Sequence, residues 1–145
     1  MNKYQEMKER HQKGFNGFPM FFAFNNEQFD EGMRSLGLEP NDISAICHIG
    51  AGGYIRKTDK ESFKSLLNGF DKEHRKAIAA DTTGEGYIYD MFLYELANHE
   101  YCITYDDTDT LEACGLNIQD ILDNKALANG LYLAKEKYLA NCNEW

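Results

Sequence analysis

The sequence contains no Lys or Arg between Ala77 and Asn124, although that stretch carries eleven carboxylates. The 145-residue chain has a net charge of −9. Residues 1–76 carry +1 of this charge and residues 77–145 carry −10. Such an acidic chain is repelled by phosphate backbones, so direct binding to nucleic acid is disfavoured. A basic surface of another protein would be attracted, and we expect a protein partner of that kind.

Long apolar runs are also missing. No segment approaches the roughly 18 apolar residues that a membrane-spanning helix requires. Residues 1–6 are polar, unlike the start of a secretory signal peptide. We therefore expect a cytoplasmic protein that does not bind a membrane.

Cysteine is scarce and scattered, with no C-x-x-C pair among the four residues Cys47, Cys102, Cys114 and Cys142. Without such a pair or a secretory context, we expect free and mostly buried thiols. A nucleophilic cysteine needs a nearby base, and only His48 adjoins one of the four. Neighbours in a strand point to opposite faces of the sheet, so Cys47 and His48 are a poor catalytic pair.

What is present indicates a single α+β domain over residues 1–145. Apolar residues make up 43% of the chain and aromatic residues 13%, which is enough for a packed core. We predict a sheet of three to four strands, covered by about five to seven helices, with residues 1–13 as a peripheral N-terminal helix. The predicted strands are residues 20–24, 43–49, 54–57 and 101–105, of which the second and third form a hairpin through residues 50–53. Helices are predicted near residues 27–36, 58–69, 71–80, 85–99, 107–114, 118–122 and 126–142.

The segment 85–99 is predicted to be a mostly buried central helix, because it is apolar on nearly all sides. The residues Tyr87, Met91 and Tyr94 lie on its second side, which is either core or interface. Its acids recur every five residues, so they spiral around the helix and form no stripe: Glu85, Asp90, Glu95 and Glu100. At least one of them should lie near the interior. There it needs a hydrogen bond, a raised pKa, or a cation such as Arg56 or Arg75.

Glu95 and His99 are four residues apart and share a helix face. That spacing allows a hydrogen-bonded pair at the margin of the core. It also allows metal binding or acid/base catalysis, with Asp90 or Asp81 as a third group. No H-E-x-x-H or C-x-x-C motif completes a metal site, so neither a metal nor another cofactor is expected.

Two further motifs have structural explanations. The run Asp106-Asp-Thr-Asp109 lacks the sixth-position Gly and the twelfth-position Glu of a calcium-binding hand. Helix capping by Asp106 or Asp107 accounts for it. The glycine-rich residues 50–53 lack the Gly-Lys-Ser/Thr ending of a phosphate-binding loop and fit a turn.

Three segments resemble a known family: FAFNNEQFDEG (residues 22–32), GAGGYIRKTD (50–59) and AIAADTTGEGYIYDMFLYELANHEY (77–101). They are similar to a family of small uncharacterised proteins of gut bacteria, their mobile elements and phages. The family has no established activity, so the resemblance assigns no catalytic residue. It implies an origin among accessory genes, many of which counter host defence.

Two functions from different classes are consistent with these observations. The favoured one is an acidic inhibitor, encoded by a phage or mobile element, that blocks the nucleic-acid site of a host defence nuclease of the CRISPR or restriction type. Its predicted partner-binding residues are Asp81, Glu85, Asp106, Asp107, Asp109, Glu112, Asp120 and Asp123. The alternative is a small metal-dependent or acid/base hydrolase. It would use a cluster of Asp81, Glu85, Asp90, Glu95 and His99.

Overall fold

The computed structural model describes residues 1–142, and the chain folds as two compact units. The sheet unit comprises residues 10–72. The helical unit comprises residues 1–9 and the described part of residues 73–145. Helices α1 (Lys3–Asn16) and α3 (Lys60–Ala80) contribute residues to both units. The α+β prediction is confirmed, with eight α-helices and one three-stranded antiparallel sheet in residues 1–142. The prediction of one domain over the whole chain stays a prediction.

The sheet unit is built on the predicted hairpin. Strands β2 (Ile46–Gly50) and β3 (Gly53–Arg56) pair antiparallel, and β1 (Phe21–Phe22) adds to the other edge of β3. The turn between β2 and β3 has positive φ angles at three successive residues, which explains its glycines. Helix α2 (Asn26–Ser35) begins at Asn25, whose side chain accepts a hydrogen bond from the backbone of Gln28.

A small core joins α2 to the sheet, formed by Phe21, Met33, Leu36 and Ile46. Gly32 is required there, because a Cβ atom at this position would overlap the ring of Phe21. Two 3-10 turns flank the hairpin, Ile43–Ala45 and Lys57–Asp59. The strand predicted over residues 43–49 therefore begins three residues later than expected, at Ile46.

Helix α3 is continuous, so the predicted break near Gly69 is wrong. A glycine inside a helix costs about 1 kcal/mol relative to alanine. Packing of aromatic side chains outweighs that cost in the sheet unit: the His11 ring stacks on Phe70 at 4.2 Å between ring centres, and Phe15 packs on Phe63. Helix propensity is a weak guide where tertiary contacts of this kind are present.

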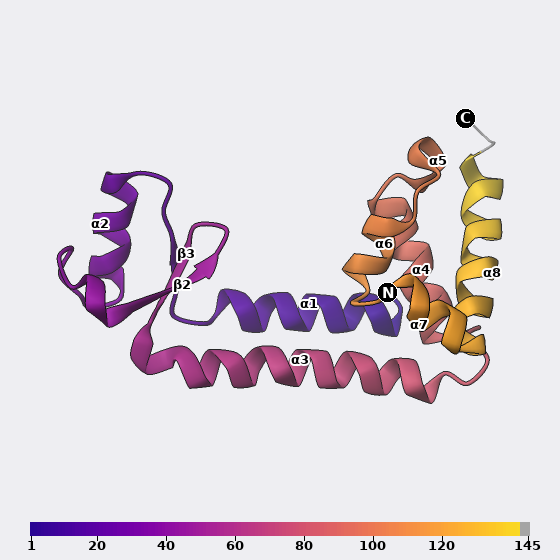
Figure 1. Cartoon of the computed structure of the whole chain (residues 1–145), viewed down its shortest axis with the longest axis horizontal. Helices are drawn as coiled ribbons and strands as arrows, with labels where there is room; N and C mark the ends of the chain where they lie inside the picture. Colours follow the sequence, from indigo (N-terminus) through magenta and orange to yellow (C-terminus); the bar gives the residue numbers. More distant parts are fainter. Residues whose placement is uncertain (143–145) are drawn as a thin grey trace. The chain divides into compact units, whose positions relative to one another are not determined.

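The helical unit is organised around α4 (Tyr87–Asn98), the predicted central helix. Four of its apolar residues are completely buried: Ile88, Met91, Phe92 and Leu96. Helix α8 (Lys125–Cys142) runs beside α4 (Figure 1). The short helices α5 (Tyr101–Thr104) and α6 (Thr108–Ala113) also pack on α4, and α7 (Ile118–Asp123) packs on α8. The first residues of α1 join the same core through Tyr4 and Met7.

The strand predicted over residues 101–105 is wrong, because these residues form the single helical turn α5. All three strands found in residues 1–142 lie between residues 21 and 56, and a strand needs a neighbouring strand for its backbone hydrogen bonds. The turn satisfies its own backbone, with the Tyr105 amide donating to the Tyr101 carbonyl at 2.8 Å. It is bounded by two residues with left-handed φ angles of 52°, Glu100 and Tyr105. Such angles are unfavourable for residues with a side chain.

Candidate functional site

The carboxylate of Glu95 is completely buried on the inner side of α4. Its Oε1 atom lies 2.9 Å from the Nζ atom of Lys8 on α1. The ammonium of Lys8 also lies over the rings of Tyr4 and Tyr94, at 5.6 and 5.2 Å from their centres. A cation was one of the three alternatives predicted for a buried acid, beside a hydrogen bond or a raised pKa, and Glu95 has one. That cation is Lys8, and not one of the two named as examples, Arg56 and Arg75.

The second oxygen of Glu95 faces His99, one turn later on the same helix. Oε2 of Glu95 lies 3.6 Å from Nε2 of His99, which is an ion-pair distance but too long for a good hydrogen bond. Both atoms are buried and lack a hydrogen-bond partner within residues 1–142. The sequence spacing predicted a hydrogen-bonded pair, whereas the two side chains face each other at ion-pair distance without a hydrogen bond. The structure places them at the margin of the core, where 29% of the His99 side chain is exposed.

A second polar network crosses the same core beside Tyr4. The His74 ring, on α3, lies 2.7 Å from the Tyr87 hydroxyl through Nδ1 and 2.8 Å from the Cys114 carbonyl through Nε2. A carbonyl only accepts, so Nε2 of His74 donates to the Cys114 carbonyl. The single hydrogen of the Tyr87 hydroxyl has two acceptors within reach, Nδ1 of a neutral His74 ring and Sδ of Met7 at 3.2 Å. Burial and the Glu95 carboxylate raise the pKa of the Tyr4 phenol, and the same two causes raise the pKa of the Cys114 thiol to about 12. Sequence reasoning missed His74, because a lone His with no motif around it carries no signal.

Asp81 closes the loop between α3 and α4. Its Oδ1 accepts from the Gly84 amide at 2.9 Å, and its Oδ2 accepts from the Gly86 and Ile88 amides at 3.0 Å each. Burial alone would raise the pKa of Asp81, but these backbone hydrogen bonds hold it below its ordinary value. Close packing fixes the loop against α8, because a Cβ atom at Gly84 would overlap the backbone of Ala126 and Gly130.

A groove of about 770 Å³ borders this loop. Asp81, Tyr87 and Asp90 line one part of it, and Lys3 and Glu6 of α1 line another. Burial raises the pKa of Asp90, and the neighbouring Asp81 carboxylate raises it further. The groove therefore holds one carboxylate that is fixed by the backbone and one that takes up a proton more readily than usual.

The five residues of the predicted hydrolase cluster are divided among separate places. Glu95 and His99 meet in the core beside Lys8, while Asp81 and Asp90 line the groove at the start of α4. Glu85 lies in a different hollow, with Tyr89 and residues of α8. Across residues 1–142, no group of three or more His, Cys, Asp or Glu side chains is arranged to hold a metal ion.

The predicted partner-binding acids fall into two groups. Three are half-buried and have structural roles: Asp81 in its loop, Asp107 paired with Lys135 at 2.7 Å, and Asp120 in a capping box with Asn117. The other five are exposed: Glu85, Asp106, Asp109, Glu112 and Asp123. Helix α6 is capped by the side chain of Asp106, which accepts from the Thr108 amide at 2.9 Å, while Asp107 makes no capping bond.

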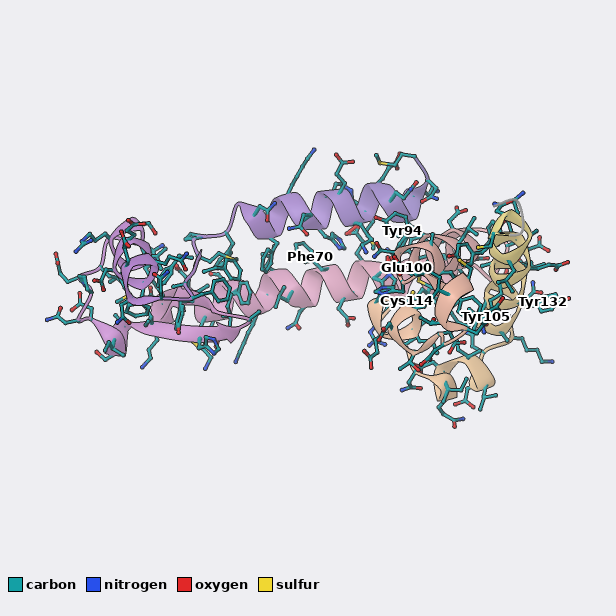
Figure 2. All side chains as sticks on the ribbon, turned by 90° about the horizontal axis from the view of Figure 1, so that it is seen from above. Phe70, Tyr94, Glu100, Tyr105, Cys114 and Tyr132 are labelled. Atoms are coloured by element: carbon teal, nitrogen blue, oxygen red, sulfur yellow. The ribbon has the colours of Figure 1, made fainter. Side chains whose placement is uncertain are left out.

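Exposed apolar side chains accompany these acids along residues 100–123. Ile103 and Tyr105 are 66% and 68% exposed, beside Glu100 and Asp106 in the sequence. Ile118 and Leu122 are exposed one turn apart on α7. Tyr105 is labelled in Figure 2, together with Tyr132, another exposed residue of the helical unit, on α8. We call residues 100–123 the acidic segment.

The net charge of the chain belongs to the helical unit. In the sequence, residues 10–72 contain eight Lys or Arg and eight Asp or Glu, so the sheet unit is neutral. Residues 1–9 and 73–145 contain seven Lys or Arg and sixteen Asp or Glu, a net charge of −9. The boundary between the two units thus coincides with a boundary in charge.

The sequence was compared with models of known protein families. A family model described as "Family of unknown function (DUF7659)" matches residues 3–137. The chain belongs to this family. No curated protein and no solved structure is significantly similar to the chain.

The sequence resemblance is confirmed in one respect: the chain belongs to an uncharacterised family whose model covers most of its length. Membership of DUF7659, a family of unknown function, assigns no functional residue to the protein. No helix within residues 1–142 has the length and apolar character needed to cross a membrane.

Proposed function

We propose that the helical unit is an acidic protein-binding surface that occupies the basic nucleic-acid site of a nuclease. The observation that carries the proposal is the confinement of the whole net charge of −9 to this unit, beside a neutral sheet unit. Phosphate-binding sites present Lys and Arg side chains, and an acidic surface competes for the same cations. More specifically, we propose that the target is a host defence nuclease of the CRISPR or restriction type. The inhibitor itself would be encoded by a phage or a mobile element.

The acidic segment supports this proposal through its composition. Stable protein interfaces combine apolar or aromatic anchors with a polar rim. Ile103 and Tyr105 supply exposed apolar surface next to the carboxylates of Glu100 and Asp106. Asp109 and Glu112 are three residues apart on α6, so they share a face of that helix. Charge steers the encounter between the proteins, and the apolar side chains then hold the complex.

Binding experiments test the proposal with two matched variants. The first neutralises three exposed acids of the acidic segment: Asp106→Asn, Asp109→Asn and Glu112→Gln. The control neutralises three exposed acids of the sheet unit: Glu27→Gln, Glu31→Gln and Glu39→Gln. Both variants lose the same formal charge, so a difference between them reports the position of the charge and not its total.

Purified protein is mixed with a panel of restriction and RNA-guided nucleases, and association rates are measured at 50 and 300 mM salt. We expect one nuclease to bind, to lose its DNA in competition, and to associate about tenfold more slowly at the higher salt. At 50 mM salt, the acidic-segment variant should already associate as slowly as wild type does at 300 mM salt. The sheet-unit variant should bind like wild type. Absence of binding to every nuclease at 50 mM salt, or equal losses in both variants, would refute the proposal.

A further inference from the structure

Two thiols and a phenol meet where α5 lies beside the C-terminal end of α8 (Figure 1). The Tyr138 hydroxyl donates a hydrogen bond to Sγ of Cys102, with an O to S distance of 3.2 Å. Cys142 follows Tyr138 by four residues on α8, so it lies on the same helix face. The Cys102 thiol interacts with both the Tyr138 hydroxyl and the Cys142 thiol. Both thiols are partly exposed.

We propose that Cys102 and Cys142 form a redox-active dithiol, which a hydroperoxide oxidises to an intramolecular disulfide. The inference does not depend on the proposed function, because it concerns the junction of α5 and α8 alone. Both thiols belong to the helical unit, and both can be reached by a small oxidant. Oxidation therefore requires no rearrangement of one unit against the other.

The surroundings assign different roles to the two sulfur atoms. The hydrogen bond from Tyr138 first, and that from Cys142 second, lower the pKa of the Cys102 thiol. Burial first, and the neighbouring Cys102 second, raise the pKa of the Cys142 thiol. Thiolates react with peroxides and thiols do not. The Tyr138 hydroxyl donates to the Cys102 sulfur at 3.2 Å, so Cys102 is the attacking residue and Cys142 is the resolving residue.

The reaction balances in two steps. The Cys102 thiolate attacks one oxygen of the peroxide, so an S–O bond forms while the O–O bond breaks. The sulfur is oxidised by two electrons to a sulfenic acid, and the peroxide is reduced and leaves as hydroxide or alkoxide. Cys142 then attacks the Cys102 sulfur, so an S–S bond forms and the S–O bond breaks. The departing hydroxide takes the Cys142 proton and becomes water.

The remaining two cysteines are set apart from this site. Cys114 is completely enclosed in the core of the helical unit, where its raised pKa keeps it protonated. Cys47 lies on β2 in the sheet unit, with its sulfur 3.9 Å from the carbonyl of His48. A single oxidising event should therefore consume two of the four thiols, and the two should be those at the junction of α5 and α8.

The full chain is treated with one equivalent of hydrogen peroxide, and its free thiols are then blocked and mapped by mass spectrometry. Cleavage at Lys together with Asp and Glu separates Cys102 from Cys114, because residues 103–113 contain four acidic residues but no Lys or Arg. We expect a mass loss of about 2 Da, reversed by dithiothreitol, and one crosslinked peptide pair containing Cys102 and Cys142. Oxidation of Cys47 before Cys102, or disulfides formed only between molecules, would overturn the proposal.

Two variants test the assigned roles in the same assay. Cys142→Ser should stop the reaction at a sulfenic acid on Cys102, which dimedone traps. Tyr138→Phe removes only the hydroxyl, so it should slow the loss of thiols several-fold at pH 7 while the variant remains folded by circular dichroism. Trapping of the sulfenic acid at Cys142 in a Cys102→Ser chain at the wild-type rate would refute the assignment, as would an unchanged rate in Tyr138→Phe.

Discussion

Replacing Lys8 by Met should destabilise the helical unit, because the substitution leaves the buried carboxylate of Glu95 without its cation. Methionine retains much of the volume of the Lys8 side chain, so the loss reports charge more than packing. Removing one partner of a fully buried ion pair costs about 3 to 5 kcal/mol. Here Glu95 is 0% exposed but the Lys8 side chain is 39% exposed, so solvent already weakens the pair. We therefore expect a loss of about 2 to 3 kcal/mol.

A double-mutant cycle separates the charge from other effects. Glu95→Gln keeps the shape of the side chain and removes its charge, while the ammonium of Lys8 can turn toward water because it is partly exposed. This variant should therefore lose less stability than Lys8→Met. In the double variant the uncompensated carboxylate is gone, so its stability should exceed that of Lys8→Met alone. The expected coupling energy is about 1 to 2 kcal/mol.

Urea unfolding at pH 7, with hydrogen exchange of the α4 amides as a local readout, measures these losses in the helical unit. Lys3→Met is the matched control, because Lys3 is exposed on the same helix and should change stability by no more than about 0.5 kcal/mol. A loss below about 1 kcal/mol for Lys8→Met would refute the reasoning. The reasoning would also be refuted if the stability losses of Lys8→Met and Glu95→Gln added up to the loss of the double variant, because the coupling energy would then be zero.

Two further predictions concern the loop that Asp81 closes and its contact with α8. Asp81→Asn should lower the free energy of unfolding by about 1 to 2 kcal/mol at pH 7, because one amide oxygen cannot replace both carboxylate oxygens. Either the Gly84 amide or the Gly86 and Ile88 amides then lose their acceptor. The pKa of Asp81 is held below its ordinary value, so its carboxylate stabilises the fold above about pH 4 and ceases to do so as the pH falls through the folded-state pKa. In urea unfolding, the loss of stability of Asp81→Asn relative to wild type should thus be smaller at pH 3 than at pH 7. An equal loss at both pH values would contradict this prediction. So would a loss no larger than that of the surface control Asp123→Asn. Gly130→Ala should destabilise by about 1 to 3 kcal/mol in thermal unfolding, since the added methyl meets the Ile88 side chain; a variant as stable as wild type would show that α8 can move away.

The sequence predicted those elements whose patterns match their surroundings. The central helix α4 was expected over residues 85–99 and found over Tyr87–Asn98, because its apolar residues fill a core on several sides. The hairpin of β2 and β3 was recognised from the glycines of its turn. In both cases the local signal and the tertiary contacts favour the same structure.

Prediction failed where the tertiary contacts decided the outcome. The residues 101–105 are rich in side chains that favour strands, but Tyr101 is buried in a helical core and finds no neighbouring strand. The cation of Glu95 could not be identified either, because Lys8 is 87 residues away in the sequence. Sequence patterns report which residues share a face of one element, and they do not report which element meets it.

The acids of the helical unit can now be divided by what each does for the fold. Glu95 is paired in the core, and Asp81, Asp107 and Asp120 hold a loop, an ion pair and a helix start. Another group makes no side-chain hydrogen bond or ion pair to any part of the chain that the structure describes: Glu85, Glu100, Asp109 and Glu112. Their mutual repulsion opposes folding, since like charges in one compact unit raise its free energy. Their neutralisation should therefore leave stability unchanged or slightly higher while it weakens any complex with a basic partner, and that combination distinguishes a binding surface from a structural one.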